Sequence, residues 1–200
     1  MISRIQKLAI TAAAAVSVAG PAHAEPSNGK PVDQAPRNVV LVHGAFADGS
    51  GWRGVYDELT ARGYRVTIVQ NPLTSLADDV AATRRVLDRQ DGPTILVGHS
   101  YGGTVITEAG VDPKVAGLVY VSALAPDIGE STGDQFADIP APPSFVIETG
   151  EDGFGFVNME KFKIGFAGDT SDADAAFLRD SQVPINMAIF GERVSHAAWR

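Results

Sequence analysis

The sequence has no cysteine among its 200 residues and is poor in basic side chains. The absence of cysteine excludes disulfide bonds, a zinc ribbon and any thiol nucleophile. There are 16 Lys and Arg against 24 Asp and Glu, which gives a formal net charge of −8. Such an acidic balance argues against nucleic acid or an anionic membrane as a partner. With only 4 histidines, each can be considered individually as a catalytic group.

Missing motifs narrow the chemistry further. The sequence contains neither His-Glu-x-x-His nor His-x-His, and without cysteine the supply of metal ligands is too small to predict a metal centre. It also lacks a Walker A motif, and no Gly-x-Gly-x-x-Gly motif directly follows a predicted strand. We therefore expect a reaction that needs neither a metal nor a cofactor.

Residues 1–24 have the organisation of a secretory signal peptide. Two basic residues precede an apolar stretch over residues 8–20, and an Ala-x-Ala cleavage pattern ends at Ala24. The apolar stretch is shorter than the roughly 20 residues that a membrane span requires. We expect cleavage after Ala24, a secreted or periplasmic location and no membrane insertion after cleavage. The alternative is an amphipathic first helix of the domain. Residues 25–37 are interpreted as a linker.

Residues 38–128 alternate between strand and helix patterns. Apolar, β-branched runs predict strands at 38–42, 64–69, 94–97 and 115–123. Helical spacing and capping residues predict the intervening helices at 50–62, 75–90 and 104–109. This alternation is typical of a parallel sheet covered by helices, a three-layer α/β fold.

Residues 129–200 are interpreted as a mostly helical insertion or lid. Prolines interrupt this region, a brief strand is predicted at 144–148 and a helix at 171–179, and no strand pattern is recognised afterwards. The chain is predicted to end in a closing helix of the lid. Six of the nine phenylalanines fall between residues 145 and 177, at positions 145, 154, 156, 162, 166 and 177. They are interpreted either as the lid's own core or as an apolar wall over a substrate pocket.

The segment Gly98-His99-Ser100-Tyr101-Gly102 matches the G-x-S-x-G nucleophile elbow and lies between a predicted strand and a predicted helix. A serine on so sharp a turn has strained dihedral angles, so its neighbours two residues away must be small. The following helix N-terminus supplies free N–H groups for a developing oxyanion. Ser100 is therefore the candidate catalytic nucleophile.

A second loop, His43-Gly44-Ala45-Phe46, follows the first predicted strand. Both loops leave the carboxyl edge of a parallel sheet, so the backbone N–H groups of Ala45 and Tyr101 are predicted to converge as an oxyanion hole. His43 is a candidate base, but we favour a role in fixing the loop. His99 is predicted to point into the sheet and to be structural.

These motifs resemble the α/β-hydrolase superfamily, and the resemblance covers residues 38–200. It is closest to the branch of bacterial small esterases, plant methylesterases and hydroxynitrile lyases. It implies that a small carboxylic ester acylates Ser100 and that the Ala45 and Tyr101 amides bind the oxyanion. Gly44 favours the esterases, because the lyases carry a threonine there whose hydroxyl can hold a cyanohydrin oxygen. The motifs that carry the resemblance are 43–46 with Trp52, 71–73, 98–103 and 121–126.

A serine hydrolase also needs a base and an acid, which follow the serine in the order acid, then histidine. His196 is the one histidine after Ser100, and it could act with Asp127 or Asp152. We instead interpret His196 as a polar residue of the lid, because no predicted strand precedes it. We therefore expect the remaining strands, acid and histidine to lie beyond residue 200. Three functions stay open: a serine ester hydrolase impaired in this chain, a carbon–carbon lyase, and a non-catalytic binding protein.

Overall fold

The computed structural model describes residues 35–200. The predicted signal peptide and its cleavage site lie outside these residues, so export stays a prediction. No helix of the described part has both the length and the apolarity of a transmembrane span.

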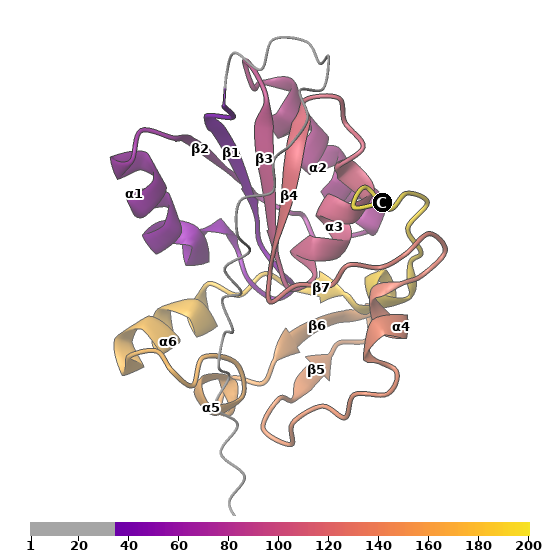
Figure 1. Ribbon diagram of the computed structural model, residues 1–200. Helices are drawn as coiled ribbons and strands as arrows, with labels where there is room; N and C mark the ends of the chain where they lie inside the picture. The colour runs from indigo at the N-terminus through magenta and orange to yellow at the C-terminus, as the bar shows by residue number, and fades with distance from the viewer. Residues whose placement is uncertain (1–34) are drawn as a thin grey trace, which may run out of the picture. The chain divides into compact units, whose positions relative to one another are not determined.

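The core is a parallel sheet of four strands in the order β2-β1-β3-β4 (Figure 1). The parallel sheet predicted from the sequence is confirmed. β1 lies between β2 and β3, so all five of its residues are buried. The strands are β1 Asn38–Val42, β2 Arg65–Val69, β3 Thr94–His99 and β4 Val115–Val121.

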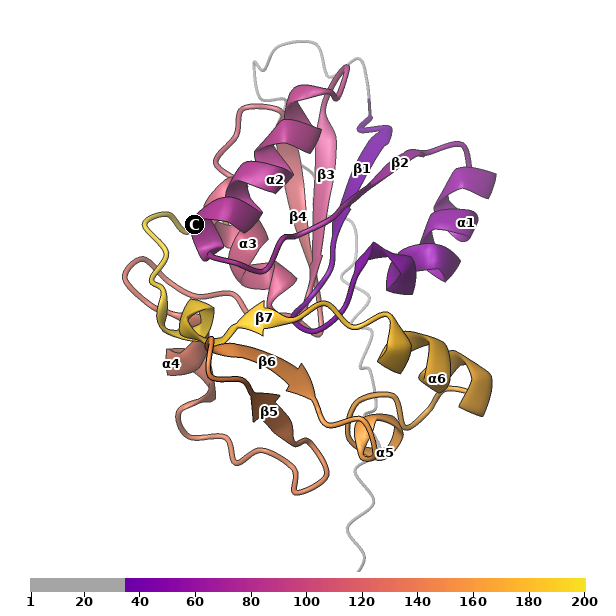
Figure 2. The same ribbon diagram turned by 180° about the vertical axis from the view of Figure 1, so that it is seen from behind.

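Helices cover both faces of the sheet, as a three-layer fold requires. Figure 2 shows α2 and α3 on one face, with α1 on the other side. Side chains alternate accordingly along β1: Val40 and Val42 pack in the cluster with α2 and α3, whereas Val39 and Leu41 pack with Trp52. The helices are α1 Arg53–Ala61 after the 3₁₀ helix η1 Gly49–Trp52, α2 Leu76–Asp88 and α3 Gly102–Ala109.

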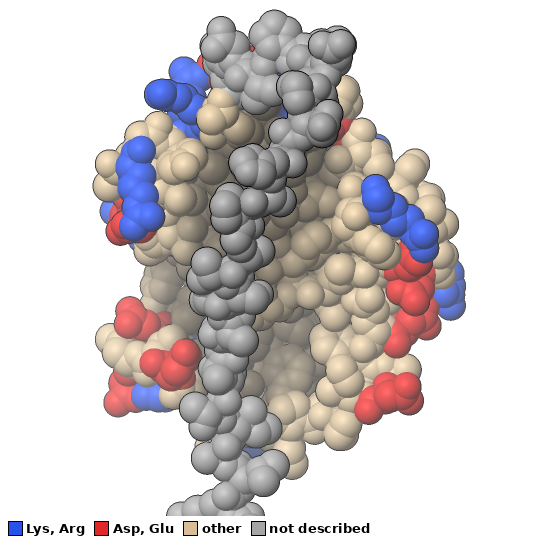
Figure 3. Space-filling view, in the orientation of Figure 1, with Lys and Arg blue, Asp and Glu red and all other residues tan. Residues whose placement is uncertain are grey.

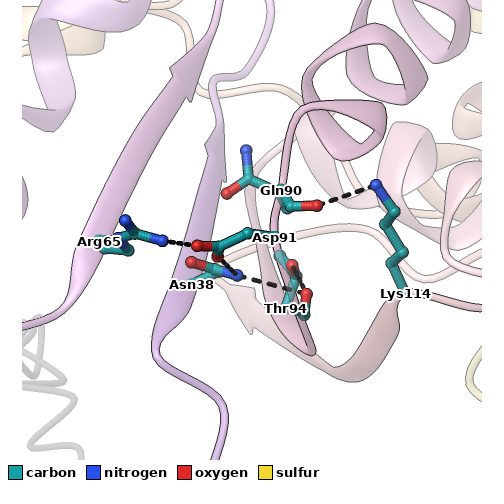
Figure 4. Close-up of polar contacts among 7 residues, drawn as sticks. Asn38, Arg65, Gln90, Asp91, Thr94 and Lys114 are labelled. Carbon is teal, nitrogen blue, oxygen red and sulfur yellow. Dashed lines mark hydrogen bonds and ion pairs between the residues drawn. The ribbon is translucent and has the colours of Figure 1, made fainter.

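The amino ends of the strands are held together by polar contacts (Figure 4). Asn38 Nδ2 donates to Asp91 Oδ1 at 3.1 Å, and Asp91 also pairs with Arg65 of β2. Lys114 Nζ donates to three main-chain carbonyls at the end of α2, at 3.1, 2.7 and 2.9 Å. A lysine there complements the negative end of the helix dipole, so this edge of the sheet is fixed electrostatically.

β4 forms one edge of the sheet and has no strand beyond it within residues 35–200. Val119 and Val121 are exposed on this strand. Figure 3 shows the face of the molecule that is turned to the viewer in Figure 1. The charged side chains on this face lie mostly at its left and right sides, and few are visible in its middle where grey atoms do not hide it. The edge strand thus presents apolar rather than charged side chains to solvent.

The lid lies against the carboxyl ends of the core strands (Figure 1) and contains a second, antiparallel sheet in the order β5-β6-β7. The expectation of no strand after residue 148 is therefore wrong. β6 has only four residues, one of them Gly155, and this is too short for a recognisable alternation. A Cβ at this position would lie 2.6 Å from Met187 Sδ, so a larger residue would displace the Met187 side chain. The lid elements are α4 Thr132–Phe136, β5 Ile147–Thr149, β6 Phe154–Val157, α5 Phe162–Phe166, α6 Asp172–Asp180, β7 Ile185–Asn186 and η2 Met187–Gly191.

The predicted closing helix is also wrong, because residues 192–200 contain no helix. Their polar groups bond to the core instead. The Ala198 N–H donates to the Thr107 carbonyl of α3 at 3.1 Å, and Trp199 Nε1 donates to the Pro126 carbonyl at 3.1 Å. These tertiary bonds replace the local bonds that a helix would make.

Candidate active site

Ser100 sits on a sharp turn between β3 and α3, with a positive φ of 53°. A Cβ at Gly98 would lie 2.5 Å from the Gly102 carbonyl oxygen, and one at Gly102 would lie 2.6 Å from the Val42 carbonyl oxygen. Contacts this short with backbone atoms leave no room for a side chain at either position. The strand–turn–helix geometry predicted for the G-x-S-x-G motif is therefore present.

Strained backbone recurs at this edge of the sheet. Within residues 35–200, four non-glycine residues have a positive φ, and one follows each strand of the core: Phe46 (62°), Leu73 (57°), Ser100 (53°) and Ser122 (42°). Such conformations cost of order 1 kcal/mol or more each and occur where the surrounding structure imposes them. Their clustering indicates that the carboxyl edge is built for a specific geometry.

The loop after β1 lies directly beside the nucleophile candidate. A Cβ on Gly44 would lie 2.9 Å from Ser100 Cβ and 3.4 Å from its Oγ. Neither the Ala45 N–H nor the Tyr101 N–H donates a hydrogen bond to any part of the chain that the structure describes. Two unpaired amides thus flank Ser100, where the sequence predicts the oxyanion hole.

His43 fixes this loop rather than serving Ser100. It is 3% exposed; its Nδ1 donates to the Gly44 carbonyl at 2.9 Å and its Nε2 accepts the Asn71 N–H at 2.9 Å. Asn71 Nδ2 in turn donates to the His43 carbonyl at 3.0 Å. Burial lowers the pKa of His43, which favours the neutral ring that these bonds require. With both ring nitrogens engaged, His43 has no position for a proton from Ser100.

The other two described histidines also make contacts away from Ser100. The His99 ring packs edge-on against Trp52, with centroids 6.2 Å apart, on the face of the sheet that η1 and α1 cover. Its side chain is exposed there, not enclosed as expected. His196 Nδ1 lies 2.7 Å from Glu108 Oε1 in the last turn of α3, whereas Ser100 precedes the first turn of that helix. Hydrogen bonds from His196 and Ser195 outweigh burial and lower the pKa of Glu108.

The acid partners considered for His196 are engaged elsewhere. Asp127 forms an ion pair with Arg200, and the Phe154 N–H donates to Asp152 Oδ1 at 3.1 Å in a turn of the lid. The structure therefore does not bring His196, Asp127 or Asp152 to Ser100. A triad built from these residues is excluded in this arrangement.

Ser100 opens into a cavity of about 370 Å³ between the core and the lid. Among its described lining residues, Ser100 alone has a polar side chain. Phe145 links both sides, because its ring lies 6.2 Å from Phe46 edge-on and 6.3 Å from Phe166 in a stack. The lid contributes Phe136, Ile139, Phe145, Phe166, Met187 and Phe190.

The six phenylalanines that the sequence singled out differ in their placement. Phe145 and Phe166 line the cavity, Phe162 is buried beneath them, Phe154 is partly buried on β6, and Phe156 and Phe177 are exposed. Both interpretations therefore hold in part. Sequence reasoning missed Phe136, Met187 and Phe190, which lie outside the cluster or on short elements with no periodic pattern.

Comparison with known proteins gives consistent matches. A model described as the alpha/beta hydrolase family matches residues 39–200. The pyrethroid hydrolase of Sphingobium wenxiniae is 33% identical over 158 residues, covering 66% of this chain and 55% of the relative. The carbendazim hydrolyzing esterase of a Nocardioides species is 35% identical over 108 residues, covering 47% of this chain and 45% of the relative. The chain thus spans about half the length of these curated relatives.

A solved structure agrees with the fold. A crystal structure of a variant of the pyrethroid hydrolase PytH has a TM-score of 0.67 at 25% identity. The match covers 80% of this chain and 71% of that chain.

Proposed function

The chain belongs to the α/β-hydrolase family, and from this premise we propose that it is a serine ester hydrolase acting on small, apolar carboxylic esters. One observation carries the proposal: among residues 35–200, Ser100 is the single polar side chain that lines the apolar cavity, and it stands beside the Ala45 and Tyr101 amides, which have no acceptor within those residues. A nucleophile next to preorganised donors is the arrangement that acyl transfer requires.

In the proposed cycle, Ser100 Oγ attacks the ester carbonyl carbon and gives up its proton. The negative charge develops on the carbonyl oxygen, where the Ala45 and Tyr101 N–H groups receive it. Collapse of the tetrahedral intermediate breaks the bond to the alcohol, whose oxygen takes up the proton that Ser100 gave up. Water then adds to the acyl carbon, releases the acid and returns a proton to Ser100. None of the histidines in residues 35–200 hydrogen-bonds to Ser100, so the proposal assigns the base and acid to no described residue.

The apolar lining supports an apolar substrate. A cavity of about 370 Å³ is at the small end of the range for ligand pockets. Its described lining residues include no charged side chain that could bind a charged acyl or alcohol group. The names of two similar proteins, a pyrethroid hydrolase and a carbendazim hydrolyzing esterase, support ester hydrolysis as the reaction class. We further propose export, on the pattern of residues 1–24.

Crowding at Gly44 disfavours the carbon–carbon lyase alternative. A threonine at position 44, as the lyases carry, would place its Cβ 2.9 Å from Ser100 Cβ, so the loop would have to move. A non-catalytic binding protein is the second candidate, because no histidine is bonded to Ser100 among the described residues.

The test is covalent labelling with a fluorophosphonate, together with turnover of p-nitrophenyl acetate and butyrate. We expect labelling of Ser100 in the full chain, loss of labelling in Ser100→Ala, and faster turnover of butyrate than of acetate. Absence of both labelling and turnover overturns the proposal. Cleavage of mandelonitrile would support the lyase, and binding of phenyl esters without turnover would support the binding protein.

A further inference from the structure

Asp79 is a carboxylate with no solvent exposure beneath the elbow, in the first turn of α2. Its Oδ2 accepts the Tyr101 hydroxyl at 2.7 Å, and its Oδ1 accepts the Leu73 N–H at 2.8 Å. Neither partner is a cation. A buried carboxylate without a cationic partner is costly, so these two hydrogen bonds are what hold it in place.

The first hydrogen bond constrains the elbow. Tyr101 directly follows Ser100, and its N–H is one of the two unpaired amides. Its ring is 1% exposed and packs edge-on against Phe190 at 6.2 Å, while its hydroxyl is held by Asp79. The Tyr101 carbonyl also accepts the Thr104 N–H at 2.9 Å, so Tyr101 is held at both its main chain and the tip of its side chain and has little freedom to reorient its amide.

The second hydrogen bond reaches the other donor loop. Leu73 is fully buried and has a strained φ of 57°. The hydrogen bond from its N–H to Asp79 helps to maintain this conformation. Two residues earlier, Asn71 exchanges hydrogen bonds with His43, whose ring donates to the Gly44 carbonyl. Gly44 immediately precedes Ala45. The polar contacts thus run from Asp79 through the loop after β2 to the loop after β1.

We propose that Asp79 is a positioning residue for the oxyanion hole: through the Tyr101 hydroxyl and the Leu73 N–H it holds both amide donors toward the same point beside Ser100. This inference rests on the proposed function of Ser100. It assigns a role in function to a buried acid that is not among the residues lining the cavity.

The protonation state of Asp79 gives this role a pH dependence. Burial raises the pKa of Asp79 to about 6, while the hydrogen bonds from Tyr101 and Leu73 oppose the rise. The negative side chains that face it are Asp78 on its own helix and Glu192 after η2, and both raise its pKa further. Above this pH the carboxylate accepts both bonds as an anion; below it the neutral acid accepts them more weakly.

The test measures oxyanion binding at equilibrium, which does not need turnover. A phenylalkyl boronic acid adds to Ser100 Oγ, whose proton leaves, and a boron-bound oxygen takes the place of the oxyanion. The matching phenylalkyl alcohol fills the apolar cavity without this adduct. We expect Asp79→Asn and Tyr101→Phe to weaken boronate binding about tenfold to 100-fold, less than the loss of a whole donor, and to leave alcohol binding unchanged.

Matched controls lose comparable groups away from the site. Tyr120→Phe removes a hydroxyl bonded to Thr107, and Asp91→Asn changes an acid at the opposite edge of the sheet. Both are expected to bind the boronate as the wild type does. We also expect wild-type boronate affinity to weaken below a pH of about 6 and this inflection to be absent in Asp79→Asn.

The outcomes separate the two ideas. If the wild type does not bind the boronate, the proposed function fails. If the wild type binds and Asp79→Asn and Tyr101→Phe bind equally well, the positioning role of Asp79 is wrong. Equal weakening of alcohol and boronate binding also refutes it, because that result describes a damaged fold. Should Asp79→Asn not fold, Tyr101→Phe and the wild-type pH profile decide the question.

Discussion

The elbow glycine Gly98 gives the sharpest prediction of stability. Replacing it by alanine places a Cβ 2.5 Å from the Gly102 oxygen, 2.7 Å from the Gly102 carbonyl carbon and 2.9 Å from the Gly103 nitrogen. All three are backbone atoms of the elbow and of the first turn of α3, so no side-chain rotation relieves the contacts. Overpacking of this kind costs about 1–3 kcal/mol, and alanine recovers about 0.5–1 kcal/mol of backbone entropy in the strand. Because the clashing atoms are backbone atoms, the upper end of this cost applies, and we expect a net loss of about 2 kcal/mol.

The same substitution at Gly54 is the matched control. Gly54 is exposed on α1, and a Cβ there would have no atom within 4 Å. Alanine is the better helix former, so Gly54→Ala should raise the free energy of unfolding by about 0.5–1 kcal/mol. One chemical change is thus expected to have opposite signs at two places.

Urea unfolding followed by tryptophan fluorescence measures both. With a denaturant slope of about 2 kcal/mol per molar, Gly98→Ala should lower the midpoint by about 1 M and Gly54→Ala should raise it slightly. Gly98→Ala should also abolish fluorophosphonate labelling. An unfolding midpoint for Gly98→Ala equal to that of the wild type would refute the crowding argument, and with it the claim that the glycines set the elbow.

Three further predictions concern other parts of the chain. Lys114→Met should lower the free energy of unfolding by about 1–2 kcal/mol in urea, because three carbonyls at the end of α2 lose their donor; Lys161→Met, whose ammonium makes no described hydrogen bond, should not. The pKa of Asp79, raised by burial to about 6 and thus above its unfolded value, means that the folded chain binds the proton more tightly. The wild-type free energy of unfolding should therefore fall by up to about 3 kcal/mol, relative to Asp79→Asn, as the pH rises from about 4 through 6; parallel pH profiles would contradict this. Phe166→Ala should raise KM for a phenyl ester about fivefold to tenfold with little change in kcat, since it removes a stacked ring from the cavity wall, and the exposed Phe177→Ala should leave both constants unchanged.

Local sequence patterns were sufficient for the core. Buried β-branched runs and capping residues predicted its strands and helices in order, because each strand of a doubly covered sheet is a short apolar run. Ser75 caps α2 as predicted, accepting the Asp78 N–H at 3.0 Å. The elbow was predictable as well, because Gly98 and Gly102 stand two residues on either side of Ser100, where any side chain would contact backbone atoms.

The rest depends on contacts between segments far apart in the chain. Asp79 lies three residues after Leu76 and four before Thr83, so helical spacing alone places it on the buried face of α2 and the neighbouring Asp78 on the exposed face. The sequence does not show which group satisfies the buried carboxylate, because that group is the hydroxyl of Tyr101, 22 residues later. Similarly, residues 192–200 avoid a helix because their donors find acceptors on α3 and beside β4. The cavity wall likewise combines core loops with lid segments whose strands are too short to predict.

The two edges of the sheet divide stability and function between them. At the amino ends of the strands, Asn38 donates a hydrogen bond to Asp91, and Lys114 donates to main-chain carbonyls at the end of α2. At the carboxyl ends, a left-handed residue follows each of the four strands of the parallel sheet, and its strain is sustained by the packing around it. A selection for thermal stability alone would therefore accumulate glycine or asparagine at this second edge, beginning with Ser122, which is exposed. The same selection would gradually release the loops that hold the amides beside Ser100.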